Sequence, residues 1–303
     1  MKTPTNTSLP RPLAMPAPTR RGIIVMILSV LAFTLNSLLL KYLGTSDRPI
    51  SASLPLLFRA GIGMIIVLAF VRGNRPTRIR PVFTERRLIW RGLSGLLGTA
   101  AYYWTVPTLG AGKATLICNT YVVFASLLAA LFLGEKLTQR RFLWLALAFA
   151  GIVLLTGPGL NGGGFSVGWN EVIALAGALT AAWSVILIRQ LVRDHSVGTI
   201  YLSQCIWIFL PMLFLTGSEL PGLNLSDVLL LTLAAAAAGF GQLAMNEGYR
   251  FLSVSSGGSL QMLWPVFTTL GGILFFSEKF AILQAIGAIF ILGAIWRVSA
   301  KAV

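Results

Sequence analysis

Charge, cysteine and histidine are all scarce in this chain. Only 11% of its 303 residues are charged, whereas 56% are hydrophobic; ordinary soluble domains are about 25% charged. This shortage of charge excludes a typical soluble domain and predicts an integral membrane protein. The two cysteines, Cys118 and Cys205, both fall inside apolar runs, so we expect small buried side chains rather than a disulfide framework.

The residues that most catalytic sites require are also missing. The single histidine, His195, lies among charged residues between two apolar runs, and the sequence contains no HExxH motif. No pair of acids lies in the middle of an apolar run, and no serine has a base beside it in a recognisable motif. We therefore expect no enzyme activity, no catalytic residues, no metal site and no cofactor.

Positive charge is in excess, with a formal net charge of +15. Nucleic-acid binding would require the basic residues to gather on one water-exposed face. Instead they lie in the short breaks between apolar runs, as basic residues do in the cytoplasmic loops of membrane proteins. The sequence thus predicts the lipid bilayer as a partner and excludes nucleic acid.

Long apolar runs recur through most of the chain. A bilayer core of roughly 30 Å needs about 20 apolar residues in a helix. Ten such runs follow one another: 22–43, 52–71, 88–108, 112–133, 140–157, 169–189, 199–216, 226–249, 254–276 and 281–298. The alternation typical of membrane strands is absent, and hydrocarbon offers no partner to free backbone groups. The predicted fold class is an all-α integral membrane protein with ten transmembrane helices.

The segment at residues 1–21 is rich in proline and arginine. Such a composition cannot bury a core, and it predicts a disordered basic N-terminal tail. The apolar run that follows, at 22–43, is longer than the apolar core of a signal peptide, which has about 7–15 residues, and it lacks a small-residue cleavage pattern. We expect this run to be retained as the first helix.

One phrase occurs twice in the sequence, 143 residues apart. YVVFASLLAALFLGEKL at 121–137 aligns with WPVFTTLGGILFFSEKF at 264–280, and the same offset places Gly98 against Gly241. Self-similarity at this period is typical of carriers that are built from two copies of one helical unit. The pattern predicts two repeats of five helices each.

The two predicted repeats occupy 22–157 and 169–298, and the glycine-rich stretch at 158–168 is predicted to be a flexible connector. Because five is an odd number, the second repeat must enter the membrane from the opposite side to the first. Corresponding breaks in the two repeats should therefore face opposite compartments.

The distribution of basic residues supports this inversion. The break after the second run and its flanks hold seven arginines: Arg72, Arg75, Arg78, Arg80, Arg86, Arg87 and Arg91. The corresponding break in the second repeat, GSELPGLNLSD, holds no lysine or arginine. By the positive-inside rule, the first break and both termini are cytoplasmic. The basic residues expected on the outer side are Lys41, Arg48, Lys113 and Lys279.

Three stretches carry a family resemblance. RGLSGLLGTAAYYWTVPTLGAGKATLI at 91–117 and GEKLTQRRFLWLALAFAGIVLL at 134–155 resemble the first EamA domain of the drug/metabolite transporter (DMT) superfamily, and LSVSSGGSLQMLWPVFTTLGGILFFSEKF at 252–280 resembles the second. The aromatic stretch AAYYWTVP and several tryptophans make the chain most similar to YddG-type amino-acid exporters. The resemblance implies a multi-pass transporter of the bacterial inner membrane.

In a carrier with inverted repeats, the substrate site lies near the middle of the bilayer, where the halves meet. We therefore take polar and aromatic side chains near the middle of the runs as candidates for substrate binding. They are Asn36, Arg59, Thr99, Tyr103, Asn119, Tyr121, Trp183, Gln204, Trp207, Gln242, Asn246 and Trp264. Thr99 and Gln242 occupy matched positions in the two repeats, as do Tyr121 and Trp264.

Structural alternatives stay open for these candidates. A polar side chain in a membrane helix also forms hydrogen bonds between helices, and Trp183 at mid-span either stacks on substrate or fills packing space. Arg59 either binds a substrate carboxylate through paired hydrogen bonds or turns outward to the membrane surface and backbone carbonyls. For Glu135 and Glu278, at the starts of loops, we expect a structural role in capping or bracing helix ends, and for Glu247 an ion pair with Arg250.

The sequence thus predicts an alternating-access transporter that exports neutral or aromatic amino acids and related metabolites from the cytoplasm. The alternatives are a carrier of another small metabolite or drug and a channel-like facilitator, since the number of helices does not distinguish a channel from a carrier. The preferred amino acid, proton coupling, the oligomeric state and the resting access state are open at this point.

Overall fold

The computed structural model describes residues 20–46, 49–70, 76–133, 168–252, 254–261, 263–279 and 281–300, with short fragments between 143 and 154. All regular elements in these residues are helices, which confirms the all-α prediction. The predicted tail at 1–21, the apolar run at 140–157 and the connector at 158–168 lie largely outside the described residues.

The helices follow the apolar runs to within a few residues. In the first part of the chain they are α1 (Arg20–Thr45), α2 (Ser53–Phe70), α3 (Arg80–Thr84), α4 (Arg86–Leu109), α5 (Ala111–Asn119) and α6 (Tyr121–Leu133). In the second part they are α8 (Trp169–Leu191), α9 (Val197–Thr216), the 3-10 helix η1 (Gly217–Gly222), α10 (Leu225–Phe251), α11 (Val254–Gln261), α12 (Leu263–Phe276) and α13 (Ile282–Ala300).

Membrane-spanning character is clearest in four segments. Within the described residues, α1, α8, α9 together with η1, and α10 are long and apolar enough to cross a bilayer. Large apolar side chains cover the outside of the bundle; Phe214 is 91% exposed and Leu274 is 76% exposed. Polar side chains such as Asn36 and Gln242 are buried instead. An apolar exterior around a polar interior fits a bundle surrounded by lipid.

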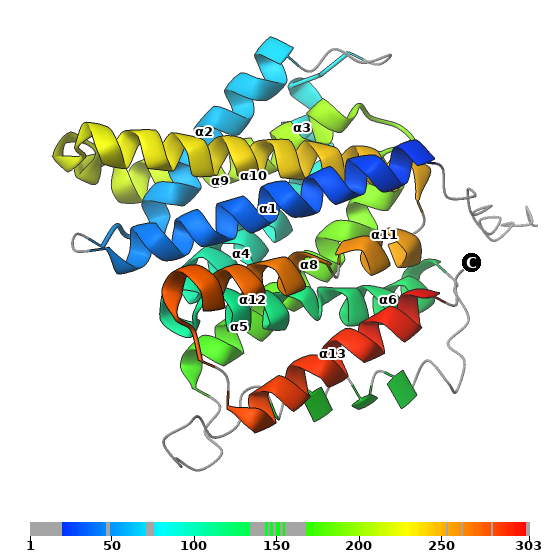
Figure 1. Ribbon diagram of the computed structural model, residues 1–303. Coiled ribbons are helices and arrows are strands. Elements are labelled where there is room, and N and C mark those ends of the chain that lie inside the picture. Colours follow the sequence, from blue (N-terminus) through cyan, green and yellow to red (C-terminus); the bar gives the residue numbers. More distant parts are fainter. Residues whose placement is uncertain are drawn as a thin grey trace, which may run out of the picture.

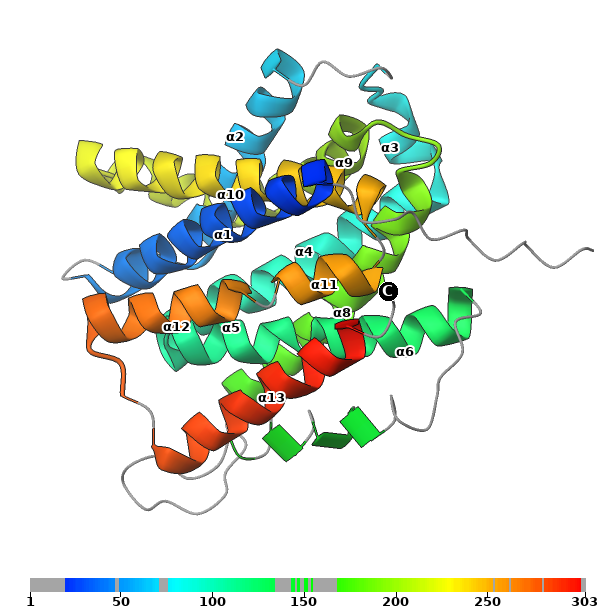
Figure 2. The same ribbon diagram turned by 45° about the vertical axis from the view of Figure 1, so that its right-hand side comes forward.

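Helices from the two parts of the chain pack in pairs. α1 lies along α10, α2 packs against α9, and α4 packs against α8 (Figures 1 and 2). Each pair joins one helix from the first half of the chain with one from the second. In Figure 1 the start of α1 and the end of α13 lie at the same, right-hand end of the bundle.

The sequence predicts one continuous helix at 112–133, and this prediction is wrong. Thr120 is a turn between α5 and α6, and both its backbone N–H and its Oγ1 donate to the carbonyl of Ile117, at 3.1 and 2.6 Å. A threonine side chain that bonds to its own turn competes with the helical hydrogen-bond ladder. The break separates two candidate site residues, Asn119 and Tyr121.

Ion pairs form at the ends of the helices, and some of them connect the two halves. Arg87, at the start of α4, lies 2.6 Å from Glu85 and 3.0 Å from Asp194, and His195 Nε2 lies 2.6 Å from Glu85 Oε2. Lys113 of α5 pairs with Glu171 of α8 at 2.8 Å. The predicted pair of Glu247 with Arg250 is present at 3.1 Å.

The prediction that Glu278 braces a helix end is also confirmed. Its carboxylate accepts the backbone N–H groups of Ala111 at 2.6 Å and Gly112 at 3.1 Å, the first residues of α5. Gly110 adopts a φ of 91° at this junction, a conformation that favours glycine. A carboxylate at a helix N-terminus satisfies free donors and complements the helix dipole.

We expect Glu278→Ala to lower the stability of the protein by about 1–2 kcal/mol, because two N–H groups at the start of α5 lose their acceptor. Glu278→Gln retains one amide oxygen and should cost less. Thermal unfolding of the purified protein in detergent measures both variants. A melting temperature of Glu278→Ala equal to that of the wild type would contradict this role.

Candidate functional site

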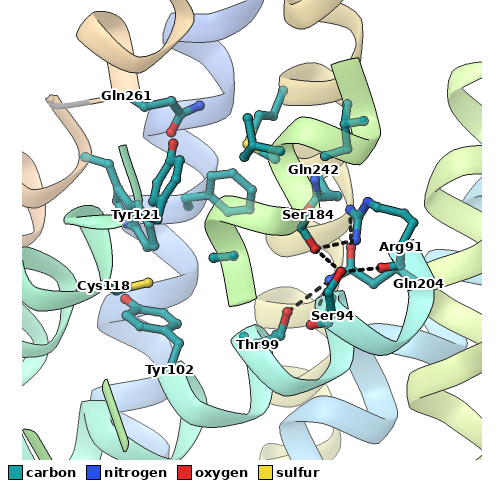
Figure 3. A pocket seen from close by; sticks show the side chains of 18 of the residues that line it. Arg91, Ser94, Thr99, Tyr102, Cys118, Tyr121, Ser184, Gln204, Gln242 and Gln261 are labelled. Carbon is teal, nitrogen blue, oxygen red and sulfur yellow. Dashed lines mark hydrogen bonds between the residues drawn. The ribbon is translucent and has the colours of Figure 1, made fainter. Parts of the chain in front are cut away.

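A cavity of about 110 Å³ lies inside the bundle, lined by residues from α1, α2, α4, α5, α6, α8, α9, α10, α11 and α12. One buried water needs roughly 10–15 Å³ on this measure, so the cavity holds several waters or part of a small ligand. Figure 3 shows its aromatic residues on one side and a polar group around Arg91 on the other.

The structure brings seven of the twelve candidate residues to this cavity. They are Asn36, Arg59, Thr99, Tyr121, Gln204, Gln242 and Trp264. The residues come from both halves of the chain, and the matched pairs Thr99 with Gln242 and Tyr121 with Trp264 are all among them. The pairs of helices that join the two halves of the chain position these residues, because each pair buries the polar faces of its two helices.

An aromatic wall forms one side of the cavity. The Trp264 ring centroid lies 5.2 Å from that of Tyr102 and 5.5 Å from that of Phe33. Ser37 Oγ accepts hydrogen bonds from Tyr102 Oη at 2.6 Å and from Trp264 Nε1 at 3.1 Å. These bonds hold both rings in place, so the wall is prepared to contact an apolar or aromatic ligand group.

Arg59 points into the bundle rather than out to the membrane surface. Only 5% of it is exposed, and its guanidinium donates to Tyr103 Oη and to Gln242 Oε1, both at 3.2 Å. The guanidinium also lies 5.7 Å from the centre of the Tyr103 ring. These contacts come from α4 and α10, so helices of both halves hold the cation at the cavity.

Two candidates, Tyr103 and Asn246, do not line the cavity but contact Arg59 or its partner Gln242. Tyr103 Oη donates to Asn36 Oδ1 at 3.3 Å, and Asn246 Oδ1 accepts from Gln242 Nε2 at 3.0 Å. Asn36 in turn donates to the carbonyl of Ala234 at 3.0 Å. Such a chain of hydrogen bonds fixes the orientation of the groups that face the ligand.

Arg91 is the main residue that sequence reasoning missed. The sequence places it with the cytoplasmic arginines, but it is only 1% exposed and lines the cavity. Its guanidinium donates to Gln204 Oε1 at 2.9 Å and to Ser184 Oγ at 3.5 Å. The glycines that follow Arg91 in the motif RGLSG could have indicated that its side chain lies along its own helix, since a Cβ at Gly95 would meet the Arg91 guanidinium.

Four further cavity residues were also absent from the candidates. They are Ser94, Tyr102, Ser184 and Gln261. Ser94 and Ser184 share a hydrogen bond of 2.7 Å beside Arg91, and Gln261 donates to Ser29 Oγ at 3.2 Å. Serine is common in the contacts between membrane helices, so the sequence alone offers no reason to single these serines out.

Three further candidates do not line the cavity. Trp183 packs edge-on against Phe132, with ring centroids 5.0 Å apart, so its contact here is packing between α8 and α6. Trp207 donates from Nε1 to the carbonyl of Val82 at 3.4 Å. Asn119 is fully buried, and its amide has no hydrogen-bond partner among the described residues.

The charged side chains that line the cavity are all positive. Two arginines line it, and none of its lining residues is acidic. The acids that the structure describes are engaged elsewhere, as in the pairs of Glu85, Glu171 and Glu247 and the helix cap of Glu278. A buried cation without a counterion is costly, so the arrangement favours a ligand that brings negative charge.

A family model matches the chain twice, at residues 20–157 and 168–300, and it describes the EamA-like transporter family. The chain belongs to the EamA-like transporter family. The two matches cover the two predicted repeats, and each contributes helices to the cavity. The resemblance that the sequence carries is thereby confirmed, and the relatives of this EamA protein are transporters.

Several curated relatives of this EamA protein span nearly its whole length. An uncharacterised protein of Pseudomonas aeruginosa is 30% identical, with 87% of this chain and 89% of the relative covered. The pseudopaline exporter of the same species is 23% identical, with 91% and 94% covered. A probable amino-acid metabolite efflux pump of Escherichia coli is 25% identical, with 93% and 98% covered.

A solved crystal structure has the same fold. It superposes with a TM-score of 0.64 at 19% sequence identity and covers 93% of this chain and 96% of its own. At this identity the likeness concerns the fold alone. Membership of the family establishes a membrane transporter, and the exporter relatives make a small molecule the expected cargo.

Proposed function

We propose that this EamA protein exports amino acids and related carboxylate metabolites from the cytoplasm by alternating access. One observation carries the proposal: one cavity is lined by both family segments and combines an aromatic wall with the guanidinium of Arg59. Guanidinium binds carboxylate through two parallel charge-assisted hydrogen bonds. The names of two relatives, an exporter and an efflux pump, support the direction of transport.

The architecture that we propose is ten transmembrane helices in two inverted repeats of five, at 22–157 and 169–298. Two family matches of similar length support the repeats, and the arginine-rich break at 72–91 supports their inversion. In this arrangement both termini face the cytoplasm of a bacterium, which agrees with the start of α1 and the end of α13 lying at one end of the bundle (Figure 1). Substrate then binds where the two repeats meet.

Reporter fusions test the topology. Fusions within the segment at 72–91 should report the cytoplasm, and fusions within the segment at 219–227 should report the outer side. Both segments in the same compartment would exclude the inverted arrangement.

The aromatic wall agrees with the neutral and aromatic amino acids that the sequence predicts. When the substrate carboxylate binds Arg59, the side chain of the substrate reaches the aromatic rings nearby. Tyr103, which contacts Arg59, packs edge-on against Tyr102 with ring centroids 6.2 Å apart, and Tyr102 in turn contacts Trp264. The packing of aromatic rings around an apolar side chain stabilises the complex.

Counterflow in liposomes tests transport. Purified protein should exchange labelled amino acids one for one and show saturation across a panel that includes phenylalanine, threonine, glutamine and glutamate. An open pore cannot drive one-for-one exchange, so saturable counterflow separates a carrier from a channel-like facilitator. Exchange no faster than in protein-free vesicles for every member of the panel would refute the proposal.

A further inference from the structure

The polar side of the cavity is organised around Arg91. Ser184 and Gln204 accept from its guanidinium, and Ser94 shares a hydrogen bond with Ser184. Gln204 Nε2 donates onward to Thr99 Oγ1 at 3.0 Å. Figure 3 shows this group opposite Tyr102 and Tyr121. The aromatic wall and the Arg91 group therefore address different parts of one bound molecule.

The Arg91 guanidinium has more N–H donors than it has acceptors among the described residues. A guanidinium carries five N–H groups, and the described residues accept from Arg91 at two atoms, Gln204 Oε1 and Ser184 Oγ. Its Nε has no partner among the described residues. Both acceptors are neutral, so neither supplies a negative charge that offsets the positive charge of Arg91. A structural arginine at this depth would be expected to pair with an acid.

Arg59 brings a second guanidinium to the same cavity. Its guanidinium is held by Tyr103, whereas the Arg91 guanidinium extends to Gly95. The two guanidiniums have different hydrogen-bond partners, Tyr103 and Gln242 for Arg59 and Gln204 and Ser184 for Arg91. One carboxylate in a bidentate pair therefore saturates only one of them.

We propose that the preferred substrates carry two carboxylates and a net negative charge. One carboxylate binds Arg59 beside the aromatic wall, and the second binds Arg91 among Ser94, Ser184 and Gln204. This inference rests on the proposed function and changes its preferred substrates: the neutral amino acids that the sequence predicts become the weaker ones. A neutral zwitterion brings no net charge to offset two buried cations, whereas a dicarboxylate neutralises both. A cationic ligand would be repelled, since no acid lines the cavity.

Glutamate and glutamine form the matched pair that tests the inference, because they differ only in one carboxylate. Wild-type protein in liposomes should exchange glutamate about tenfold faster than glutamine at the same low concentration, the effect of one added charge-assisted contact. Glutarate, which lacks the amino group, should compete with labelled glutamate, and the neutral diamide of glutarate should not.

The Arg91→Gln variant separates recognition from folding. If Arg91 binds the second carboxylate, exchange of glutamate falls about tenfold more than exchange of glutamine, so that the preference for glutamate disappears. Arg91→Lys keeps the charge and should retain part of the preference. If Arg91 only supports the fold, both substrates lose exchange equally in Arg91→Gln, which overturns the inference.

A second measurement uses the wild-type protein alone. Glutarate should raise the melting temperature of the protein in detergent, and its diamide should leave it unchanged. Equal exchange of glutamate and glutamine, or equal stabilisation by glutarate and its diamide, overturns the dicarboxylate inference and leaves the proposed function standing. No exchange of any amino acid overturns the proposed function and this inference with it.

Discussion

Replacing Arg59 with glutamine is expected to slow transport about a hundredfold for every substrate that carries a carboxylate. The side chain is buried at the cavity and oriented by Tyr103 and Gln242. Each charge-assisted hydrogen bond to a carboxylate contributes roughly 1.5–3 kcal/mol, and glutamine removes the charge and the paired donors. A hundredfold loss corresponds to about 2.7 kcal/mol. Initial rates of counterflow at low substrate concentration measure the effect.

Two control variants are needed to interpret this result. Arg59→Lys keeps the charge but not the planar pair of donors, so it should fall between the wild type and the glutamine variant. Arg80→Gln makes the same change at an exposed position on α3 and should leave transport unchanged. Transport by Arg59→Gln at the wild-type rate would exclude Arg59 from substrate binding.

Adding one methyl group at Gly177 is expected to destabilise the protein by about 2–3 kcal/mol. A Cβ at this position would lie 2.5 Å from Ala101 Cβ, and the backbones of Gly98 and Gly177 are in close contact. Neither partner is the flexible end of a long side chain, so α4 and α8 must move apart. Because both helices line the cavity, we also expect Gly177→Ala to lower transport.

The same contact offers a rescue experiment. Ala101→Gly removes the methyl group that a Cβ at Gly177 meets, so the double variant should recover most of the melting temperature that Gly177→Ala loses. Such recovery shows direct coupling of the two positions. Gly217→Ala is the control, because nothing lies within 4 Å of a Cβ there. Equal melting temperatures of Gly177→Ala and Gly217→Ala would contradict the close packing of α4 and α8.

The two arginines show where sequence reasoning succeeds and where it stops. Arg59 is conspicuous because it stands alone inside an apolar run, where a charge demands an explanation. Arg91 follows Arg86 and Arg87 in a basic segment and reads as one more positive residue at the membrane surface. Only the helices that cover it, α8 and α9, turn it into a cavity residue.

Aromatic candidates show the same limit. Tyr121 and Trp264 occupy matched positions in the two repeats, and both line the cavity. Trp183 lies at mid-span and is predicted on that ground, yet it packs against Phe132. Depth in the membrane is readable from the distance along a helix. The direction of a side chain depends on how the helix is rotated against its neighbours, and one helix does not encode that rotation.

By itself, the sequence determined the membrane class, the helical fold, most helix boundaries and the family, because the length of an apolar run and the recurrence of a motif are local properties of the chain. The tertiary structure decided that Arg91 faces the cavity, that Trp183 and Trp207 do not, and that Thr120 interrupts a predicted helix. The placement of Arg91, Trp183 and Trp207 arises where a helix from one half of the chain packs against a helix from the other, and such contacts have no signature within either helix alone.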